Sequence, residues 1–453
     1  MASSTIGPFP DSGTPVDEVV RELDAKRDND VRWAEGRTFG LVFDGGDEVR
    51  DVAERAARLF LHENALNTAA FPSLGEIQSE LCGWTADLLH GPPETAGFLT
   101  SGGTESILCA VEAARERARA ERSVTEPEIV LAESAHAAFH KGAHLFGLRT
   151  RMVPVTDDWT VDLDAMADAV GPNTALVVAS APQYPQGVVD PVAEIAELAA
   201  GVGASCHVDA CMGGFVLPFA SIEEPDAWGS PPWDLAVEGV TSISADLHKL
   251  GYAPKGASVI LHRSRRLRRY QTFDFDGWLG GRYVTPNLQG TRSGLPMAAA
   301  WAVVRHLGMD GYRHLVRSAI GSADRIRTAV RAIDGITVPG DPRHHLLSIV
   351  SDTSSDEPID VFAQQEDVSA IDADAFEDTV TVEQSVVEDA DAGLFGRDQR
   401  AVDVDLFGHR MGQGSDADVG GPKARPHRGL TPSSNNLVCT NGSDPDSRSD
   451  PGD

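Results

Sequence analysis

Residues 96–262 alternate short apolar runs with helical segments, and this alternation is the strongest constraint on the fold. The runs of strand length are AGFLT, EIVLAE, ALVVASAP, ASCHVDAC, GVTSISAD and ASVILH. Strands that alternate with helices in this way predict an α/β protein with a large, mostly parallel sheet and helices on both of its faces. Ligands of such sheets bind beyond the carboxyl ends of the strands. We therefore expect the functional site in the loops SGGTES and DACMGG and in their neighbours.

The pattern outside this region divides the chain into four sections. Residues 1–60 are expected to form a helical N-terminal segment with helices over 16–34 and 47–62, and residues 61–305 the large domain. Residues 306–364 begin a small C-terminal α/β domain, with a helix over 311–333 followed by the strands GITVP and LLSIVSD. Residues 365–453 are acidic and weakly periodic, which predicts a disordered tail and an incomplete small domain.

Composition limits the partners and the compartment. The chain has 69 acidic and 38 basic residues, a net charge of −31, which argues against nucleic acid or an anionic membrane surface as a partner. An acidic surface poor in lysine suits a halophilic protein, because high salt screens the self-repulsion. Five cysteines without CxxC spacing indicate a reducing compartment and no zinc site. Without a signal peptide or a membrane-spanning run, we expect a soluble cytoplasmic protein.

Lysine is so rare that its positions are informative. Only five lysines accompany 33 arginines, and two of them, Lys249 and Lys255, lie in the run GVTSISADLHKLGYAPKGASVIL. Arginine stays protonated at any working pH, whereas a desolvated lysine can lose its proton and attack a carbonyl to form a Schiff base. Lys249 is therefore the candidate covalent residue. The alternative is an ordinary surface lysine that follows a strand.

Three further motifs gain meaning when they are taken together. TSGGTES places two glycines and several hydroxyls at a helix start, which is either a phosphate site or an ordinary capped turn. Asp209 in HVDACMGG can pair with a protonated ring nitrogen or cap the next turn, with Cys211 in the pocket wall. His136 can lie flat on a ring, whereas a metal pair with His140 lacks the HExxH glutamate and a third ligand. A phosphate cradle, a stacking histidine, an aspartate and a lysine together predict a site for pyridoxal 5'-phosphate.

These runs resemble the PLP-dependent group II decarboxylase family, and within it the sphingosine-1-phosphate lyase branch. The likeness covers about residues 60–350, through NALNTAAFPS, TSGGTES, AHAAFHKG, HVDACMGGF, SISADLHKLGYAPKG and GWLGGRYVTPNLQGTRSG. It implies the type I aminotransferase fold and a homodimer with active sites at the subunit interface. The implied cofactor contacts are Lys249, Asp209, His136, Gly103, Thr104, Ser244 and His248, with Gly290 and Thr291 from the partner subunit. The implied substrate contacts are Asn64, Asn67, Tyr283 and Lys255.

The resemblance implies a PLP-dependent carbon–carbon lyase acting on a small-molecule amine through a Lys249 Schiff base. Lys255 matches a second lysine of the lyase branch and favours retro-aldol cleavage or a phosphorylated substrate. Asn67 stands where that branch commonly has a histidine, a departure that concerns the exact phospholipid substrate. An L-amino acid decarboxylase is the alternative function. A generic phosphate-binding module and an inactive remnant with a truncated small domain are two further alternatives. We also hypothesise that the chain beyond about residue 364 is out of register with its family.

Overall fold

The computed structural model describes residues 9–35, 40–223, 232–333, 336–351 and 379–383. The chain divides into two compact units. The described part of the second unit is Asp274–Tyr283, and all other described residues belong to the first. Among the described residues, none of the helices combines the length and the apolar character needed to cross a membrane.

A seven-stranded sheet forms the centre of the first unit, with the strand order β1-β7-β6-β5-β4-β2-β3. The strands are β1 (Ala96–Thr100), β2 (Glu128–Ala132), β3 (Arg149–Val153), β4 (Thr174–Ser180), β5 (Ser205–Asp209), β6 (Ser242–Ala245) and β7 (Ser258–His262). Strands β2 to β6 pair in parallel, and β7 runs antiparallel to both of its neighbours. The prediction of an α/β fold with a mostly parallel sheet is confirmed.

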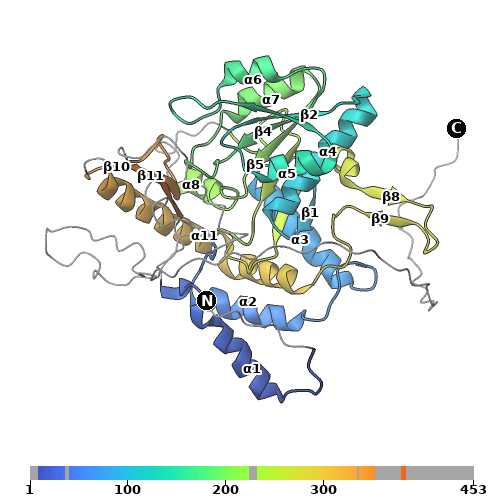
Figure 1. Cartoon of the computed structure of the whole chain (residues 1–453), viewed down its shortest axis with the longest axis vertical. Helices are drawn as coiled ribbons and strands as arrows, with labels where there is room; N and C mark the ends of the chain where they lie inside the picture. Colours follow the sequence, from blue (N-terminus) through green and yellow to red (C-terminus); the bar gives the residue numbers. More distant parts are fainter. Residues whose placement is uncertain (1–8, 36–39, 224–231, 334–335, 352–378, 384–453) are drawn as a thin grey trace, which may run out of the picture. The chain divides into compact units, whose positions relative to one another are not determined.

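Helices cover both faces of this sheet because β4 carries buried apolar side chains on both of its faces. In β4, Leu176 and Val178 pack on one face with α4 (Gly103–Arg122) and α5 (Ala138–Phe146). Val177 and Ala179 point to the opposite face and pack with α7 (Val192–Gly201). This alternation follows from the two-residue period of a strand. Figure 1 shows α4 and α5 on one side of the strands, and α7 with α6 (Leu163–Ala169) on the other.

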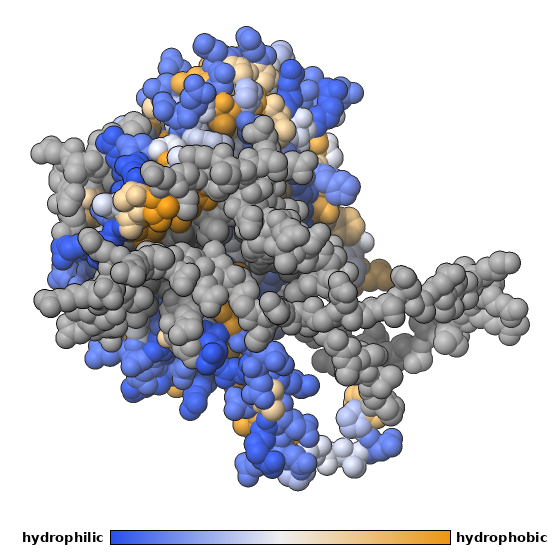
Figure 2. Space-filling model, turned by 60° about the vertical axis from the view of Figure 1, so that its left-hand side comes forward, coloured by the Kyte–Doolittle hydropathy of each residue, from blue (hydrophilic) through white to orange (hydrophobic). Residues whose placement is uncertain are grey.

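The N-terminal helices are shorter than the sequence pattern predicts. α1 (Val16–Ala25) is followed by two 3-10 turns, Lys26–Asn29 and Trp33–Glu35, and α2 ends at Leu59 (Asp47–Leu59). α3 (Pro72–Leu88) begins at Pro72, whose missing N–H costs nothing at this position. On the face shown in Figure 2, the described residues are mostly hydrophilic, as the acidic composition leads one to expect.

A long helical element leads to the small domain. α11 (Leu295–Val330) is interrupted at Gly308, whose φ of 55° is left-handed, and its second part includes most of the helix predicted over 311–333. Ala323 and Val330 of α11 pack against Leu347 of β11. The strands β10 (Ile336–Thr337), β11 (Leu346–Ser351) and β12 (Thr379–Glu383) form an antiparallel sheet. β12 falls inside the predicted tail, whose other residues lie outside the described part of the chain, so the disordered tail and the incomplete small domain stay predictions.

The second unit contains the tip of a hairpin that the sequence did not predict. Its strands are β8 (Phe273–Phe275) and β9 (Tyr283–Thr285). Arg282 forms an ion pair with Asp274, and the rings of Trp278 and Tyr283 meet edge to face with their centroids 6.2 Å apart. The predicted substrate contact Tyr283 thus lies in the second unit.

The remaining short elements belong to the first unit. They are α8 (Leu217–Glu223), α10 (Arg265–Arg268) and a 3-10 turn, Arg269–Gln271.

Candidate active site

The glycines of TSGGTES let the β1–α4 turn lie against the segment that carries Lys249. A Cβ atom on Gly103 would lie 2.7 Å from Asp246 Oδ2 and 2.8 Å from Cys211 Sγ. A Cβ atom on Gly102 would lie 2.9 Å from His248 Cε1. Atoms do not approach this closely in an unstrained structure, so only glycine fits at either position. The turn therefore packs against the segments that follow β5 and β6, as expected for a site at the carboxyl ends of the strands.

Asp209 ends β5 and is held on one of its two carboxylate oxygens. Oδ1 accepts the backbone N–H of Cys211 at 3.1 Å and the hydroxyl of Ser244 at 3.4 Å. The residue keeps 7% of its surface exposed. A strand-end aspartate in this position can both fix its local turn and present negative charge to a ligand.

His136 lies within the electrostatic reach of Asp209 and Lys249. Burial lowers the pKa of His136. The charges of Asp209 and Asp246 oppose this effect, whereas the charge of Lys249 adds to it, so the imidazole is neutral near pH 7. Its Nδ1 accepts the backbone N–H of Ala138 at 3.1 Å, which places the ring proton on Nε2. An imidazole without charge can stack on a planar group, and it does not repel that group when the group is positively charged.

Lys249 has a partner that the sequence reasoning missed. Its Nζ lies 3.1 Å from Oδ2 of Asp246, whose side chain is completely buried. Burial alone would raise the pKa of Asp246, but Lys249 and His248 together hold it well below its usual range. The spacing of three residues on one turn, in SADLHK, is the signal that could have identified this pair.

His248 and Lys255 are fixed by the same loop. His248 Nδ1 accepts the backbone N–H groups of Gly256 and Ala257 at 3.2 and 3.3 Å, so its ring donates only from Nε2, which lies 3.5 Å from Asp246 Oδ2. Lys255 Nζ donates to the carbonyl oxygen of His248 at 2.8 Å. The same ammonium lies 4.6 Å from the ring centroid of Phe43, a cation–π contact that the sequence did not predict.

The other predicted residues are not joined to this group by the described contacts. Asn64 and Asn67 use their side-chain oxygens in local turns, where they accept the backbone N–H groups of Leu66 and Ala69 at 2.9 and 3.0 Å. Thr104 is exposed at the start of α4, and Gly290 and Thr291 are exposed before α11. Their roles with substrate or cofactor, like that of Tyr283, stay predictions.

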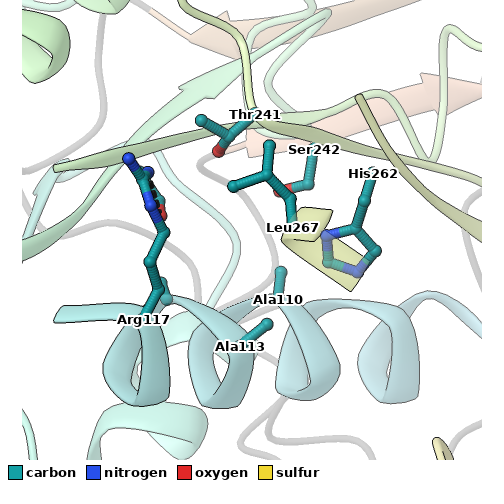
Figure 3. A pocket seen from close by; sticks show the side chains of 9 residues that line it. Ala110, Ala113, Arg117, Thr241, Ser242, His262 and Leu267 are labelled. Carbon is teal, nitrogen blue, oxygen red and sulfur yellow. Dashed lines mark hydrogen bonds between the residues drawn. The ribbon is translucent and has the colours of Figure 1, made fainter. Parts of the chain in front are cut away.

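A small cavity beneath α4 is separate from this group. Its volume is about 10 Å³, and the side chains of Ser242, His262 and Arg117 line it (Figure 3). A space of this size holds about one water molecule. It is far too small for a cofactor or a substrate.

Comparison with known proteins identifies similar sequences and structures. Residues 52–350 match the pyridoxal-dependent decarboxylase conserved domain. Rat sphingosine-1-phosphate lyase 1 is 40% identical over 348 residues, covering 77% of this chain and 60% of the rat protein. The Saccharomyces cerevisiae sphingosine-1-phosphate lyase is 35% identical over 352 residues, covering 76% of this chain and 59% of that protein. The chain thus spans about 60% of the length of these curated relatives.

Solved structures of a lyase and of a decarboxylase are also similar to this chain. The Burkholderia pseudomallei sphingosine-1-phosphate lyase superposes with a TM-score of 0.73 at 38% identity, covering 78% of this chain and 82% of that one. The Lactobacillus brevis glutamate decarboxylase shares the fold with a TM-score of 0.67 at 21% identity, covering 78% of this chain and 81% of that one.

Proposed function

Because the chain belongs to the pyridoxal-dependent decarboxylase family, we propose that it is a pyridoxal 5'-phosphate-dependent lyase that breaks a carbon–carbon bond next to an amino-bearing carbon. The type I aminotransferase fold predicted from the sequence is confirmed by the structural likenesses. The proposed substrate is a phosphorylated amino alcohol, as for a sphingosine-1-phosphate lyase. The observation that carries the proposal is the convergence of Lys249, Asp209 and neutral His136 at one edge of the sheet.

The residues present fit the cofactor. Lys249 supplies the amine for its carbonyl group, Asp209 a carboxylate for its ring nitrogen, and His136 a neutral ring for its face. The close approach of Gly102 and Gly103 to the loop after β6 leaves a backbone cradle at the N-terminus of α4, where a phosphate is favoured. When bound, pyridoxal phosphate supplies an electron-withdrawing ring that stabilises negative charge on the amino-bearing carbon.

Lys255 supports the lyase over a plain decarboxylase. Its ammonium is held between the His248 carbonyl oxygen and the Phe43 ring, at the edge of the group that contains Lys249. A fixed positive charge in this place can bind the phosphate end of a substrate and so orient the bond to be broken. This reasoning favours a substrate with a phosphate group over a free amino acid.

We further propose that the working unit is a salt-adapted cytoplasmic homodimer. In it, the exposed Gly290 and Thr291 of one subunit would reach the cofactor phosphate of the other. Sedimentation velocity in low and high salt tests this assembly. A monomer in both conditions, with full cofactor binding, contradicts it.

A reconstitution experiment tests the proposed function. The purified chain is incubated with pyridoxal phosphate, and the visible absorbance that a covalently held cofactor gives is recorded for the wild type and for Lys249→Ala. Phosphorylated amino alcohols and L-amino acids are then supplied, and aldehyde and carbon dioxide release are measured. We expect a band that Lys249→Ala abolishes, together with aldehyde release from the phosphorylated substrates.

Each alternative has its own signature in this experiment. Carbon dioxide release from an amino acid, without aldehyde release, indicates the L-amino acid decarboxylase. Cofactor binding without turnover of either class of substrate indicates an inactive remnant. An absent band, or a band that Lys249→Ala leaves unchanged, rules out the enzyme function altogether.

A further inference from the structure

A line of buried polar side chains leads from the middle of the sheet to Asp209. His207 is completely buried, with Nδ1 2.9 Å from Ser242 Oγ and Nε2 3.2 Å from Ser244 Oγ. Ser244 Oγ in turn donates to Asp209 Oδ1 at 3.4 Å. No sequence motif indicates a role for His207 or Ser242, whereas the family resemblance implies a phosphate contact for Ser244.

The register of β5 and β6 explains why these side chains meet. The two strands are parallel, and His207 lies opposite Ser242 while Asp209 lies opposite Ser244. Residues two apart in a strand share one face of the sheet, so all four side chains project from the same face. The edge of the Phe139 ring packs against the imidazole, with the centroids 5.9 Å apart and the planes at 61°. The imidazole is thus held between apolar packing and two hydroxyls.

The direction of each hydrogen bond follows from the two ends of this line. Ser244 uses its only proton on Asp209, because a carboxylate can only accept. Burial lowers the pKa of His207 to about 4, with Asp209 opposing and His262 adding to this effect, so the ring is neutral and carries one N–H. Ser244 must then accept that N–H from Nε2. Nδ1 is left as an acceptor, and it takes the hydroxyl proton of Ser242.

From this line we infer that His207 is a positioning residue for the cofactor, one that orients the Ser244 hydroxyl onto Oδ1 of Asp209. The inference rests on the proposed function, since it concerns the residue that would pair with the ring nitrogen. Ser244 and the backbone N–H of Cys211 together fix Oδ1, and the carboxylate presents its other oxygen to that ring nitrogen. Ser244 Oγ also accepts the thiol of Cys211 at 3.3 Å. Without the Nε2–H donor, that thiol alone orients the Ser244 hydroxyl, and the hydrogen bond that anchors Oδ1 of Asp209 is weakened.

Two substitutions of His207 provide a matched pair. The amide nitrogen of His207→Gln reaches the position of Nε2 and can still donate to Ser244, whereas the shorter His207→Asn reaches only the position of Nδ1. The equilibrium binding of pyridoxal phosphate is measured by fluorescence titration, and thermal unfolding shows which variants are folded. We expect binding about tenfold weaker for His207→Asn and for Ser244→Ala, the effect of one lost hydrogen bond to a charged group. Binding by His207→Gln should stay close to that of the wild type.

The tautomer gives a readout that is independent of activity. Nitrogen-15 NMR of histidine-labelled protein, with His207→Gln to assign the signal, should show Nε2 protonated and Nδ1 unprotonated at pH 7, with or without the cofactor. The opposite tautomer, a doubly protonated ring, or equal loss of cofactor affinity in the Asn and Gln variants overturns the inference. Unchanged affinity in folded His207→Asn and Ser244→Ala also overturns it.

The failure of this inference is distinguishable from the failure of the proposed function. A wild-type protein that binds no pyridoxal phosphate removes the proposed function and this inference with it. A wild-type protein that binds the cofactor but has the wrong tautomer removes only the inference.

Discussion

Substituting Gly103 with alanine tests whether the close packing of the β1–α4 turn builds the site. The new methyl group would lie 2.7 Å from Asp246 Oδ2 and 2.8 Å from Cys211 Sγ. Neither neighbour can move aside easily, since both residues are buried. Forcing a methyl group into a packed interior costs about 1–3 kcal/mol of the free energy of unfolding. We expect this loss together with weaker binding of pyridoxal phosphate, because the turn must shift away from Asp246 and Cys211.

Gly83 offers a matched control in another helix. It is exposed in α3, and a Cβ atom there would meet nothing within 4 Å. Alanine is a better helix former than glycine, so Gly83→Ala should stabilise the protein by about 1 kcal/mol. Urea unfolding gives both free energies, and fluorescence titration gives the cofactor affinities. If Gly103→Ala is as stable as the wild type and binds pyridoxal phosphate equally well, the packing argument is refuted.

Three other changes probe contacts that the structure reveals. Asp246→Asn should lower the free energy of unfolding at pH 7 by about 1–2 kcal/mol in urea unfolding, because Lys249 loses its buried partner but keeps 24% of its side chain exposed. Since the folded pKa of Asp246 is depressed, the difference from the wild type should shrink as the pH falls below 3.8, and a difference that does not shrink would contradict this. Phe43→Leu removes the ring beneath Lys255 and should raise KM for a phosphorylated amino alcohol about 2- to 5-fold in steady-state kinetics, with kcat little changed. His345 is completely buried, and burial, with His344 adding to it, lowers its pKa well below 6.5. The stability that the neutral ring contributes is therefore present above pH 6.5 and is lost as the pH falls. In urea unfolding the wild type should lose more stability than His345→Leu as the pH falls below 6.5, and parallel losses would count against this reasoning.

The central sheet could be predicted because its strands obey local rules, whereas its edges could not. β4 is buried along its whole length, and its centre, ALVVA, reads as a continuous apolar run. β3 is exposed at its first four positions and carries two arginines, so nothing in its composition distinguishes it from a loop. The β8–β9 hairpin lies in a glycine-rich segment, whose composition likewise does not distinguish it from a loop. Pairing with a neighbouring strand, which a sequence pattern does not encode, decides the structure of such segments.

The predictable part of the site consists of residues that stand out by their rarity or by their place at the end of a strand. Lys249 stood out because lysine is scarce, and Asp209 because it follows an apolar strand. Asp246 and His207 did not stand out, because their roles arise from tertiary contacts. His207 acquires its partners from a strand 35 residues away, through a register that single-sequence reasoning cannot derive.

The charges of the described group favour one orientation of the proposed cofactor. Asp209 carries a negative charge and His136 is neutral, whereas the charge of Asp246, which lies beside the glycine turn, is balanced by Lys249 Nζ at 3.1 Å. The end of the site near Asp209 is therefore negative, which suits a protonated ring nitrogen and repels a phosphate. The N-terminus of α4, with the glycine backbone of TSGGTES, is the end that favours an anion. The reverse orientation would place a phosphate dianion against a buried carboxylate, an interaction that costs more than the hydrogen bonds there could return.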